Sequence, residues 1–401
     1  MGLILLANNS QKLKILVINN LFPPQVVGGY ERAIADYARR LHDRGHEVLV
    51  LTANVEGLTT SYDQSQNEPE PMPLKRCLTL WGTWGAKGAV AYPAVYGAAI
   101  AIQNYHALKK ELRLFTPDVC LAGNLDFLGS AVAEQILAAG IPIAHYVMNG
   151  QPGYPSDLVP TSNFARNFYQ YITVSDWICR NLTENGYPTA SAQTIYPGAE
   201  VEQFYQAELP PRDQLRIVYA GLVMHYKGTD VLTEALYLLH QEGIDFTATI
   251  AGGSLTPDFV DLLKNFVEQE GMTEKVQFTG LLDRQGLREL YKTHNVWVLP
   301  SRFNEPFSIG LVEAMVAGLT IIASDTGGSP EAIEHQESGL IFESENALDL
   351  ADNLSSLALN PDQWEAMTRR GQQRGLTEFS RTRTIEQLEA LLQKLHLAKQ
   401  S

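Results

Sequence analysis

The sequence predicts an α/β protein with two domains, each built on a parallel, doubly wound sheet. Its 401 residues suggest two domains of ordinary size rather than one. Short apolar runs alternate with amphipathic helical segments in both halves, which is the pattern of a parallel sheet with helices between its strands. A polar, proline-bearing stretch at residues 201–212 separates the halves. We therefore predict domains at 1–200 and 213–383 with this linker between them.

The first half opens with an apolar run at residues 14–19, which predicts a buried strand. A helix is expected from Tyr30 to Leu41, because apolar residues recur on one of its faces. Gly28 and Gly29 stand at its start, where missing side chains would let a ligand approach the backbone; a flexible turn is the alternative. The alternation continues, with strands expected at 47–52, 117–122, 141–147 and 171–175 and helices at 96–114 and 128–140.

Two further features of the first half are candidates for a site. His145 lies near the carboxyl end of the strand expected at 141–147, where open α/β sheets bind ligands. An isolated histidine near a strand end is, however, more often a core residue. Trp81 and Trp84 stand among glycines and suggest either an aromatic platform for a sugar or lipid acceptor or a hydrophobic plug under a loop. We favour the plug.

The second half repeats the alternation. Strands are expected at 215–221, 245–251, 276–280 and 296–300, and helices at 231–241 and 258–270. The strand at 245–251 runs into Gly252, and the strand at 276–280 ends at Gly280, directly before Leu281. The last helix, at about 384–398, carries one apolar face and therefore needs a partner surface.

The stretch from 301 to 313 is the strongest candidate for a ligand site. It forms a loop and the start of a helix after the strand at 296–300, with Glu305 in the loop and Glu313 in the helix. Both carboxylates would face the crevice at the carboxyl end of the sheet. The backbone amides of Phe307, Ser308 and Ile309 would be unpaired donors at the helix start, which attract anions and above all phosphate. The alternative is that both glutamates are ordinary surface carboxylates.

Composition and charge limit the partners. The net charge of −15 is concentrated after residue 200, with 16 basic and 29 acidic residues there against 14 and 16 before it, which argues against nucleic-acid binding. Peripheral contact with a membrane stays open, although no lysine or arginine cluster indicates it. Three widely spaced cysteines form neither a metal pattern nor a disulfide framework, and no run reaches transmembrane length. We expect a cytoplasmic protein without a bound metal.

In the stretch from 301 to 313 and the segments after it, the chain resembles the nucleotide-sugar glycosyltransferases of the GT-B fold. The resemblance is specifically to glycosyltransferase family 4, the group of glycogen synthases and mannosyltransferases. The resemblance rests on Glu305 and Glu313, separated by seven residues, on the segment 314–318 (AMVAG) and on the segment 321–331 (IIASDTGGSPE). It implies two Rossmann-like domains facing a cleft, with the last helix crossing back to the first domain. It also implies retaining transfer of a hexose from a nucleotide-diphosphate sugar to an acceptor hydroxyl, without a metal or any cofactor besides the donor.

The resemblance also implies a role for each candidate residue. Glu313 would bind the ribose hydroxyls, Glu305 would contact the sugar near its reacting carbon, and Lys227 would stabilise the leaving diphosphate. His145 would orient the sugar. The remaining donor-binding residues are expected to contribute backbone groups; they are Gly28, Gly29, Gly252, Gly280, Leu281, Phe307, Ser308 and Ile309. We expect UDP as the donor nucleotide in preference to GDP or ADP, from its frequency in the family, while the acceptor stays unknown.

One position departs from the family pattern. Family members commonly carry an arginine shortly before the lysine and glycine that correspond to Lys227 and Gly228, and both cations hold the donor diphosphate. Here Leu222 stands where that arginine is usually found. The alternatives to a transferase are a nucleotide-sugar epimerase of related fold and a catalytically silent nucleotide-sugar-binding protein, of which Leu222 suggests the second.

Overall fold

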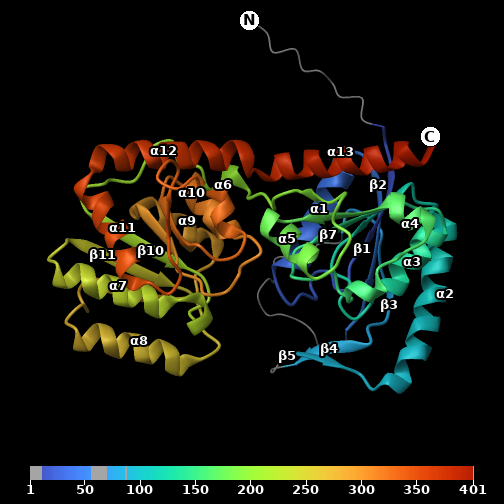
Figure 1. Ribbon diagram of the computed structural model, residues 1–401, viewed down its shortest axis with the longest axis horizontal. Helices are drawn as coiled ribbons and strands as arrows, with labels where there is room; N and C mark the ends of the chain where they lie inside the picture. Colours follow the sequence, from blue (N-terminus) through green and yellow to red (C-terminus); the bar gives the residue numbers. More distant parts are fainter. Residues whose placement is uncertain (1–10, 56–69, 86–87, 401) are drawn as a thin grey trace, which may run out of the picture. The chain divides into compact units, whose positions relative to one another are not determined.

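The computed structural model describes residues 11–55, 70–85 and 88–400, and this part of the chain divides into two compact units. The first unit contains the chain up to Val174, the segment Ile178–Ile195 and the residues from Ile385 onward. The second unit contains Ser175–Trp177 and Tyr196–Thr384. Each unit is built on its own parallel sheet (Figure 1).

The sheet of the first unit has the strand order β3-β2-β1-β6-β7-β8-β9, and neighbouring strands are parallel throughout. Its central strands are short and completely apolar or nearly so, because helices cover them. The strands are β1 (Lys14–Ile18), β2 (Glu47–Ala53), β3 (Leu74–Leu78), β6 (Val119–Ala122), β7 (Ile143–Val147), β8 (Tyr169–Thr173) and β9 (Gln193–Thr194). The helices of the same part of the chain are α1 (Gly29–Asp43), α2 (Gly97–Phe115), α3 (Ser130–Ala138), α4 (Asn163–Phe168) and α5 (Asp176–Glu184). A hairpin of β4 (Gly82–Gly85) and β5 (Gly88–Ala91) and the 3₁₀ turns η2 (Ala94–Tyr96) and η3 (Ser156–Leu158) complete it.

The sheet of the second unit has the order β12-β11-β10-β13-β14-β15 and is also parallel. Its strands are β10 (Leu215–Ala220), β11 (Phe246–Ala251), β12 (Val276–Gly280), β13 (Val296–Leu299), β14 (Thr320–Ser324) and β15 (Leu340–Phe342). Its helices are α6 (Val201–Phe204), α7 (Thr229–Gln241), α8 (Pro257–Gln269), α9 (Arg284–Thr293), α10 (Ile309–Val316), α11 (Ala347–Leu359) and α12 (Pro361–Glu378), with 3₁₀ turns η4 (His225–Lys227) and η5 (Ser329–Ala332). The last helix, α13 (Arg381–Gln400), begins in this unit and continues into the first.

Alternating side chains of the second sheet pack into two separate cores. Val296 and Val298 of β13 point into the core formed with α7, α8 and α11, whereas Trp297 and Leu299 point into the core formed with α6, α9 and α10. This period of two is that of a strand buried on both faces, and it explains why β13 is apolar at every position. Helices therefore cover both faces of this sheet, as the sequence predicts for a doubly wound fold (Figure 1).

The stretch expected as a linker belongs to the second unit instead. Residues 201–204 form α6, and both Val201 and Phe204 are buried in the core beside α10. The long segment of the second unit already begins at Tyr196, directly after Ile195 of the first unit. The polar composition of 201–212 hides these two apolar anchors, which is why the sequence places the boundary too late.

The last helix packs on the first unit from Ile385 onward. Leu388 and Leu392 are completely buried, and the buried carboxylate of Glu389 receives 2.7 Å and 2.9 Å contacts from Arg44 Nε and His46 Nε2. The apolar face that the sequence shows on this helix thus finds its partner surface there. None of the helices in the described part of the chain is long and apolar enough to cross a bilayer.

Candidate functional site

The order of the second sheet reverses between β10 and β13, and the loops that follow these two strands carry the main candidates. Lys227 follows β10 and Glu305 follows β13. Their side chains meet in an ion pair, with 3.0 Å between Lys227 Nζ and Glu305 Oε1. Only 19% and 14% of the two side chains are exposed. In open α/β sheets this reversal point is where ligands bind, so the fold brings the two predicted catalytic groups to the expected place.

Close packing of the backbone fixes the position of Lys227. Gly228 has a φ of +69°, and a Cβ atom there would lie 1.7 Å from the carbonyl oxygen of Pro300, so only glycine fits. The amides of Arg302 and Phe303 both donate to the Tyr226 carbonyl at 3.1 Å. These contacts hold the turn η4 against the end of β13, and the ammonium group of Lys227 lies over the Phe303 ring. The cation is therefore held in place by the surrounding chain.

Arg302, a cation of the loop after β13, is already engaged. Its guanidinium group donates to both carboxylate oxygens of Asp230 at 2.6 and 2.9 Å and to Glu345 at 2.8 Å. The hydrogen bonds to Asp230 are the main reason that the pKa of Arg302 is raised. A bidentate pair of this kind leaves Arg302 poorly placed to take up a further anion.

The start of α10 offers unpaired backbone donors. Ser308 is the N-cap residue, and its Oγ accepts a 3.2 Å hydrogen bond from the Leu311 amide. Among the residues that the structure describes, the amides of Phe307, Ser308 and Ile309 find no acceptor. The positive end of the helix dipole adds to these donors. An anion at this end of α10 would thus find three free N–H groups, as the sequence predicts.

Glu313 lies farther along α10 and is 6% exposed. Burial raises the pKa of its carboxyl group, and the neighbouring Arg284 opposes this shift. The contact is a 2.9 Å hydrogen bond from Arg284 Nη2 to Glu313 Oε1, and the guanidinium group stacks 5.0 Å from the Phe204 ring centre. A carboxylate can accept about four hydrogen bonds, so Glu313 keeps capacity for a ligand. No sequence pattern indicated Arg284, because it lies 29 residues away.

Glycines bring the ends of the neighbouring strands together. Gly252 has a φ of +156°, and a Cβ atom there would lie 1.6 Å from the Gly221 carbonyl oxygen. Its amide donates to the Gly280 carbonyl at 2.8 Å, so the ends of β11 and β12 are joined beside β10. Gly280 itself has a φ of +70°, and the next side chain, Leu281, is 56% exposed. The predicted residues Gly252, Gly280 and Leu281 thus lie at the carboxyl edge of the sheet.

Two further glycines support Glu305 and were not assigned a role from the sequence. A Cβ atom at Gly327 would lie 2.3 Å from the Glu305 carbonyl oxygen, and its φ is +67°. The amide of Gly328 donates to the same carbonyl at 2.8 Å. The Gly327–Gly328 pair therefore fixes the backbone of the loop from which the Glu305 side chain extends.

The Gly28–Gly29 pair occupies the equivalent reversal point of the first unit, where β1 and β6 are neighbours. Among the described residues, no atom lies within 4 Å of the place that a Cβ atom would take at either glycine. Packing within the chain therefore does not explain the missing side chains, whereas a ligand at this helix start would. The Glu31 carboxylate accepts a 2.9 Å hydrogen bond from the Gly28 amide, an arrangement that the capping-box spacing could have indicated.

His145 lies in the core of the first unit. It is completely buried, and its Nδ1 atom lies 2.6 Å from the Tyr169 hydroxyl group. The rings of Tyr154 and Tyr171 also surround it. Burial lowers the pKa of His145 to about 3, so the imidazole is neutral at physiological pH. This environment favours the core interpretation of His145 over a sugar-contacting one, and the structure does not bring it to the surface with Gly28 and Gly29.

The structure also gives surroundings to the two tryptophans and to Leu222. Trp81 and Trp84 pack edge-on against Phe127, with ring centres 5.0 and 4.9 Å apart, which supports the hydrophobic plug. Leu222 follows β10 with 40% of its surface exposed, and its carbonyl accepts a 2.6 Å hydrogen bond from the Tyr219 hydroxyl. This exposure leaves room outside the core for a longer side chain at position 222.

Two family models match this chain, and they follow one another along it. The model described as Glycosyltransferase Family 4 matches residues 27–203, and the model described as Glycosyl transferases group 1 matches residues 201–374. Between them they span residues 27–374. A curated relative from Mycobacterium tuberculosis, a GDP-mannose-dependent alpha-(1-6)-phosphatidylinositol monomannoside mannosyltransferase, is 23% identical over 377 residues. That match covers 90% of this chain and 93% of the relative.

Solved structures show the same fold. A glycosyltransferase from Rickettsia africae superposes with a TM-score of 0.76 at 18% identity and covers 96% of this chain and 98% of its own. The HepE protein of Anabaena, crystallised with UDP, superposes with a TM-score of 0.73 at 19% identity. This match covers 95% of the present chain and 100% of the HepE chain. At this level of identity the likeness concerns the fold, which in these neighbours is GT-B.

Proposed function

We propose that this chain, which belongs to the GT-B glycosyltransferases of family 4, moves a hexose from a nucleotide-diphosphate sugar to an acceptor hydroxyl with retention of configuration. The observation that carries the proposal is the Lys227–Glu305 ion pair at the reversal point of the second sheet. A cation and a carboxylate held together at that edge suit a substrate with an anionic leaving group beside a neutral sugar ring. The open amides at the start of α10 add donors for the same anion.

Charge stabilisation is the chemistry that these groups supply. The leaving diphosphate gains negative charge as the bond to the sugar breaks, and fixed donors aimed at that charge lower the barrier. Lys227 and the amides of Phe307, Ser308 and Ile309 would supply these donors. Glu305 would face the sugar near its reacting carbon. We propose that no metal is needed, because Lys227 and the helix terminus supply positive charge where a metal would otherwise act.

The rest of the donor would extend along the carboxyl edge of the sheet. Glu313 would accept hydrogen bonds from the ribose hydroxyls through the oxygen that Arg284 leaves free. The backbone at Gly252 and Gly280, with the exposed Leu281 side chain, would line the nucleobase. As the family resemblance implies, the backbone at Gly28 and Gly29 would bind the diphosphate, whereas His145, enclosed in the core of the first unit, would support the fold.

The donor nucleotide is the part of the proposal that a binding screen decides. UDP is our first choice from its frequency in the family, whereas the name of the Mycobacterium relative specifies GDP-mannose. We therefore suggest a thermal-shift series with UDP, GDP and ADP and their hexose conjugates. A ligand at about 100 times its dissociation constant stabilises a protein by about 2.7 kcal/mol, which is easily seen as a higher melting temperature. The largest shift with GDP would replace the UDP assignment, and no shift with any of them would overturn the donor proposal.

Product analysis separates the transferase from its alternatives. With the donor and a mixture of candidate acceptors, a transferase forms a new glycoside and releases the nucleoside diphosphate. An epimerase would change or hydrolyse the sugar without an acceptor, and a silent binding protein would bind nucleotide without any turnover. The anomeric configuration of the glycoside, read by nuclear magnetic resonance, tests retention in the same experiment.

Glu313→Ala should weaken the binding of the free nucleoside diphosphate by roughly 1.5–3 kcal/mol, because charge-assisted hydrogen bonds are lost. Isothermal titration calorimetry measures this directly. Glu313→Gln keeps the size of the side chain and one acceptor oxygen, so it should lose less. Arg284, whose side chain is 54% exposed, can turn to solvent in both variants and should not unfold the protein. An unchanged affinity in Glu313→Ala would remove Glu313 from the site.

Gly29→Val should lower turnover more than it lowers the affinity for free nucleotide, since we assign nucleotide binding to the second unit. Gly97→Val is a matched control. Gly97 is also the first residue of a helix, and no described atom lies within 4 Å of its Cβ position. Steady-state kinetics and calorimetry on both variants separate the two effects. If turnover and affinity fell equally in Gly29→Val, this division of roles would be wrong.

A further inference from the structure

An apolar surface extends along residues 89–102, with the sequence AVAYPAVYGAAIAI. It covers the end of β5, the turn η2 and the first turns of α2. Gly97 and Ile100 are partly covered, and every other residue of this stretch is exposed, with 79% for Val95 and 60% for Ile102. Soluble monomers rarely leave a contiguous apolar surface of this kind in water, and where one occurs it marks an interaction site.

The packing of α2 shows why this stretch faces outward. Asn104 is buried and exchanges two 2.8 Å hydrogen bonds with the backbone of Thr79. Leu108 and Leu112 are buried on the same face of the helix. The helix is therefore anchored through its second half, and its first turns carry their apolar side chains away from the core. Nothing in the described part of the first unit covers them.

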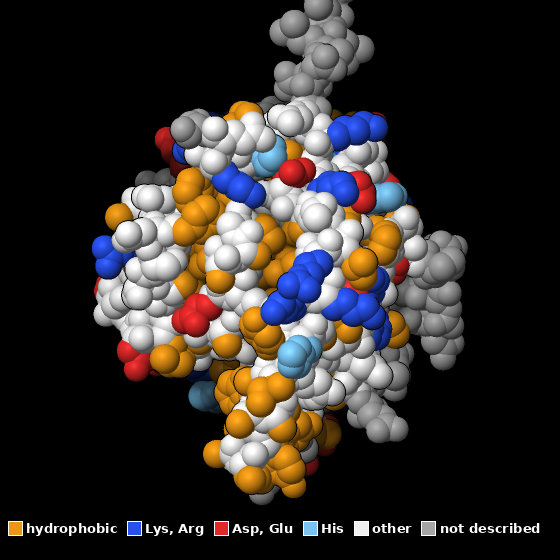
Figure 2. All heavy atoms as spheres, turned by 90° about the vertical axis from the view of Figure 1, so that its right-hand side faces the viewer, with side chains coloured by type: hydrophobic (Ala, Val, Ile, Leu, Met, Phe, Trp, Pro, Cys, Tyr) orange, Lys and Arg blue, Asp and Glu red, His pale blue; other side chains and the backbone are white. Residues whose placement is uncertain are grey.

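Exposed cations follow the apolar stretch on the same helix. Lys110 and Arg113 are exposed and Lys109 is partly exposed. The acid among them, Glu111, is buried and paired with Lys75, so the charge that α2 presents to solvent is positive. Figure 2 shows this face, with apolar side chains gathered at one end and Lys and Arg side chains above them. In a chain of net charge −15 such a basic face is complementary to an anionic surface.

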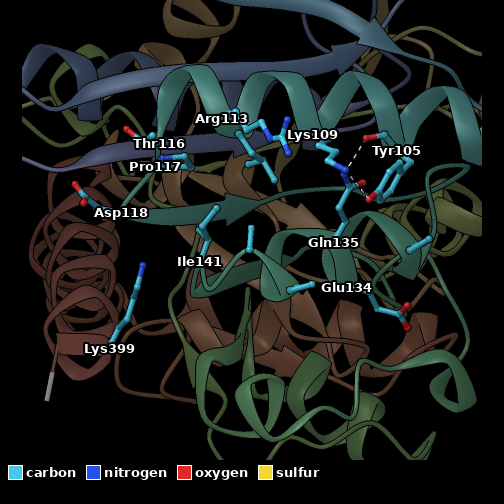
Figure 3. A pocket seen from close by; sticks show the side chains of 14 residues that line it. Tyr105, Lys109, Arg113, Thr116, Pro117, Asp118, Glu134, Gln135, Ile141 and Lys399 are labelled. Atoms are coloured by element: carbon cyan, nitrogen blue, oxygen red, sulfur yellow. Dashed lines mark hydrogen bonds between the residues drawn. The ribbon is translucent and has the colours of Figure 1, made fainter.

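Two adjoining grooves between α2 and α3 show the same change from apolar to basic residues. An apolar groove of about 400 Å³ is lined by Trp81, Ile100 and Val132, among others. Through Tyr105 and Gln135 it adjoins a groove of about 820 Å³ that contains Lys109, Arg113 and Lys399 (Figure 3). Asp118 and Glu134 also line this second groove, but Asp118 already accepts a hydrogen bond from the Lys14 amide. Apolar space that leads to cations suits an acyl chain with an anionic head group.

We propose that the docking face, defined as residues 89–113, binds a lipid surface that carries anionic head groups. The apolar residues of 89–102 would enter the boundary between head groups and acyl chains, and Lys109, Lys110 and Arg113 would contact the anionic groups. Helices that lie in a membrane surface have this combination of apolar residues and cations. Tyrosine is favoured at such an interface, and Tyr92 and Tyr96 are both exposed in the apolar stretch. The proposal does not depend on the proposed transfer reaction.

The test is sedimentation of the full chain with vesicles, first of phosphatidylcholine alone and then of phosphatidylcholine mixed with phosphatidylglycerol. We expect binding to the mixed vesicles at low salt, weaker binding at high salt because salt screens the head groups, and little binding to phosphatidylcholine. Failure to bind the mixed vesicles at low salt would overturn the proposal. Self-association of the chain that Val95→Asp abolishes would identify the face as a contact between copies and would also overturn it.

Two matched pairs of variants locate the binding surface. Val95→Asp should lower the fraction bound to mixed vesicles at least about fivefold, whereas Leu359→Asp, at a site of 76% exposure in the second unit, should not. Lys110→Glu should lower it by a similar factor, and Lys264→Glu, on the exposed face of α8, should not. All four sites are exposed, so the variants should fold, and circular dichroism checks this. If the members of each pair bound equally, the docking face would be wrong.

Discussion

Lys227→Ala is expected to lower turnover by roughly 100-fold or more, the scale seen when one preorganised charge-stabilising group is removed. Leu222 contributes no charge where the family usually has an arginine. The neighbouring Arg302 is held by Asp230 and Glu345. Lys227 therefore has no ready substitute when charge develops on the leaving diphosphate. Turnover is measured with saturating donor, so that a weaker affinity does not obscure the effect.

A control and a rescue make this result interpretable. Lys292→Ala is the control and should leave turnover unchanged. Lys292 is also paired with a glutamate, with 2.7 Å between its Nζ atom and Glu289 Oε1, but it lies on the exposed side of α9. Leu222→Arg should keep or improve donor affinity, because position 222 is 40% exposed and the new side chain can extend without entering the core. The double variant Leu222→Arg with Lys227→Ala should recover part of the lost rate. Two cations that act on the same diphosphate can partly replace each other, so the effects of changing them are not additive. Transfer at the wild-type rate by Lys227→Ala would show that another cation, such as the exposed Arg32 of α1, holds the diphosphate.

Glu305→Gln should reduce turnover by a similar factor, about 100-fold or more, while nucleotide binding survives. The glutamine has the same size and keeps an oxygen that can accept the 3.0 Å hydrogen bond from Lys227, so the loop should hold its shape. What disappears is the negative charge, which we place beside the sugar rather than beside the nucleotide. The affinity for the free nucleoside diphosphate should be unchanged or higher, because Lys227 would no longer be neutralised by its partner.

The matched control for this prediction is Glu345→Gln. Glu345 also pairs with a cation of the loop after β13, because its Oε1 atom accepts a 2.8 Å hydrogen bond from Arg302 Nε. Its side chain, however, is 64% exposed. The same chemical change there should leave both turnover and affinity close to wild type, as is usual for exposed ion pairs. Near-normal turnover in Glu305→Gln would exclude Glu305 from the reaction.

Most of the regular elements could be predicted from local pattern. Four apolar residues in β13 predict a strand buried on both faces, and the two cores on either side of Trp297 and Val298 explain that composition. The alternation of strands and helices predicts parallel sheets, and parallel sheets bind ligands where the strand order reverses. The meeting of Lys227 and Glu305 follows from this rule, although they lie 78 residues apart.

Other features depended on partners that are distant in sequence. The pairing of Glu313 with Arg284 and of Arg302 with Asp230 follows from which loops lie next to each other, and no spacing in the sequence indicates it. The boundary between the units also escaped local pattern, because two buried residues, Val201 and Phe204, outweigh the polar stretch around them. His145 looked like a site residue from its place on a strand, but the tyrosines of neighbouring segments enclose it.

Local pattern is enough to predict the two α/β domains, the loop with Glu305 and the helix with Glu313, because periodicity and turn residues act within a few positions of the chain. The apolar run at 89–102 shows the limit of such reasoning. Its composition alone predicts burial, since leaving apolar surface in water is unfavourable. Only the tertiary structure shows that α2 is fixed through Asn104, Leu108 and Leu112, so that the run is left outside. Whether an apolar segment is core or contact surface is decided by which face of its helix the rest of the protein covers.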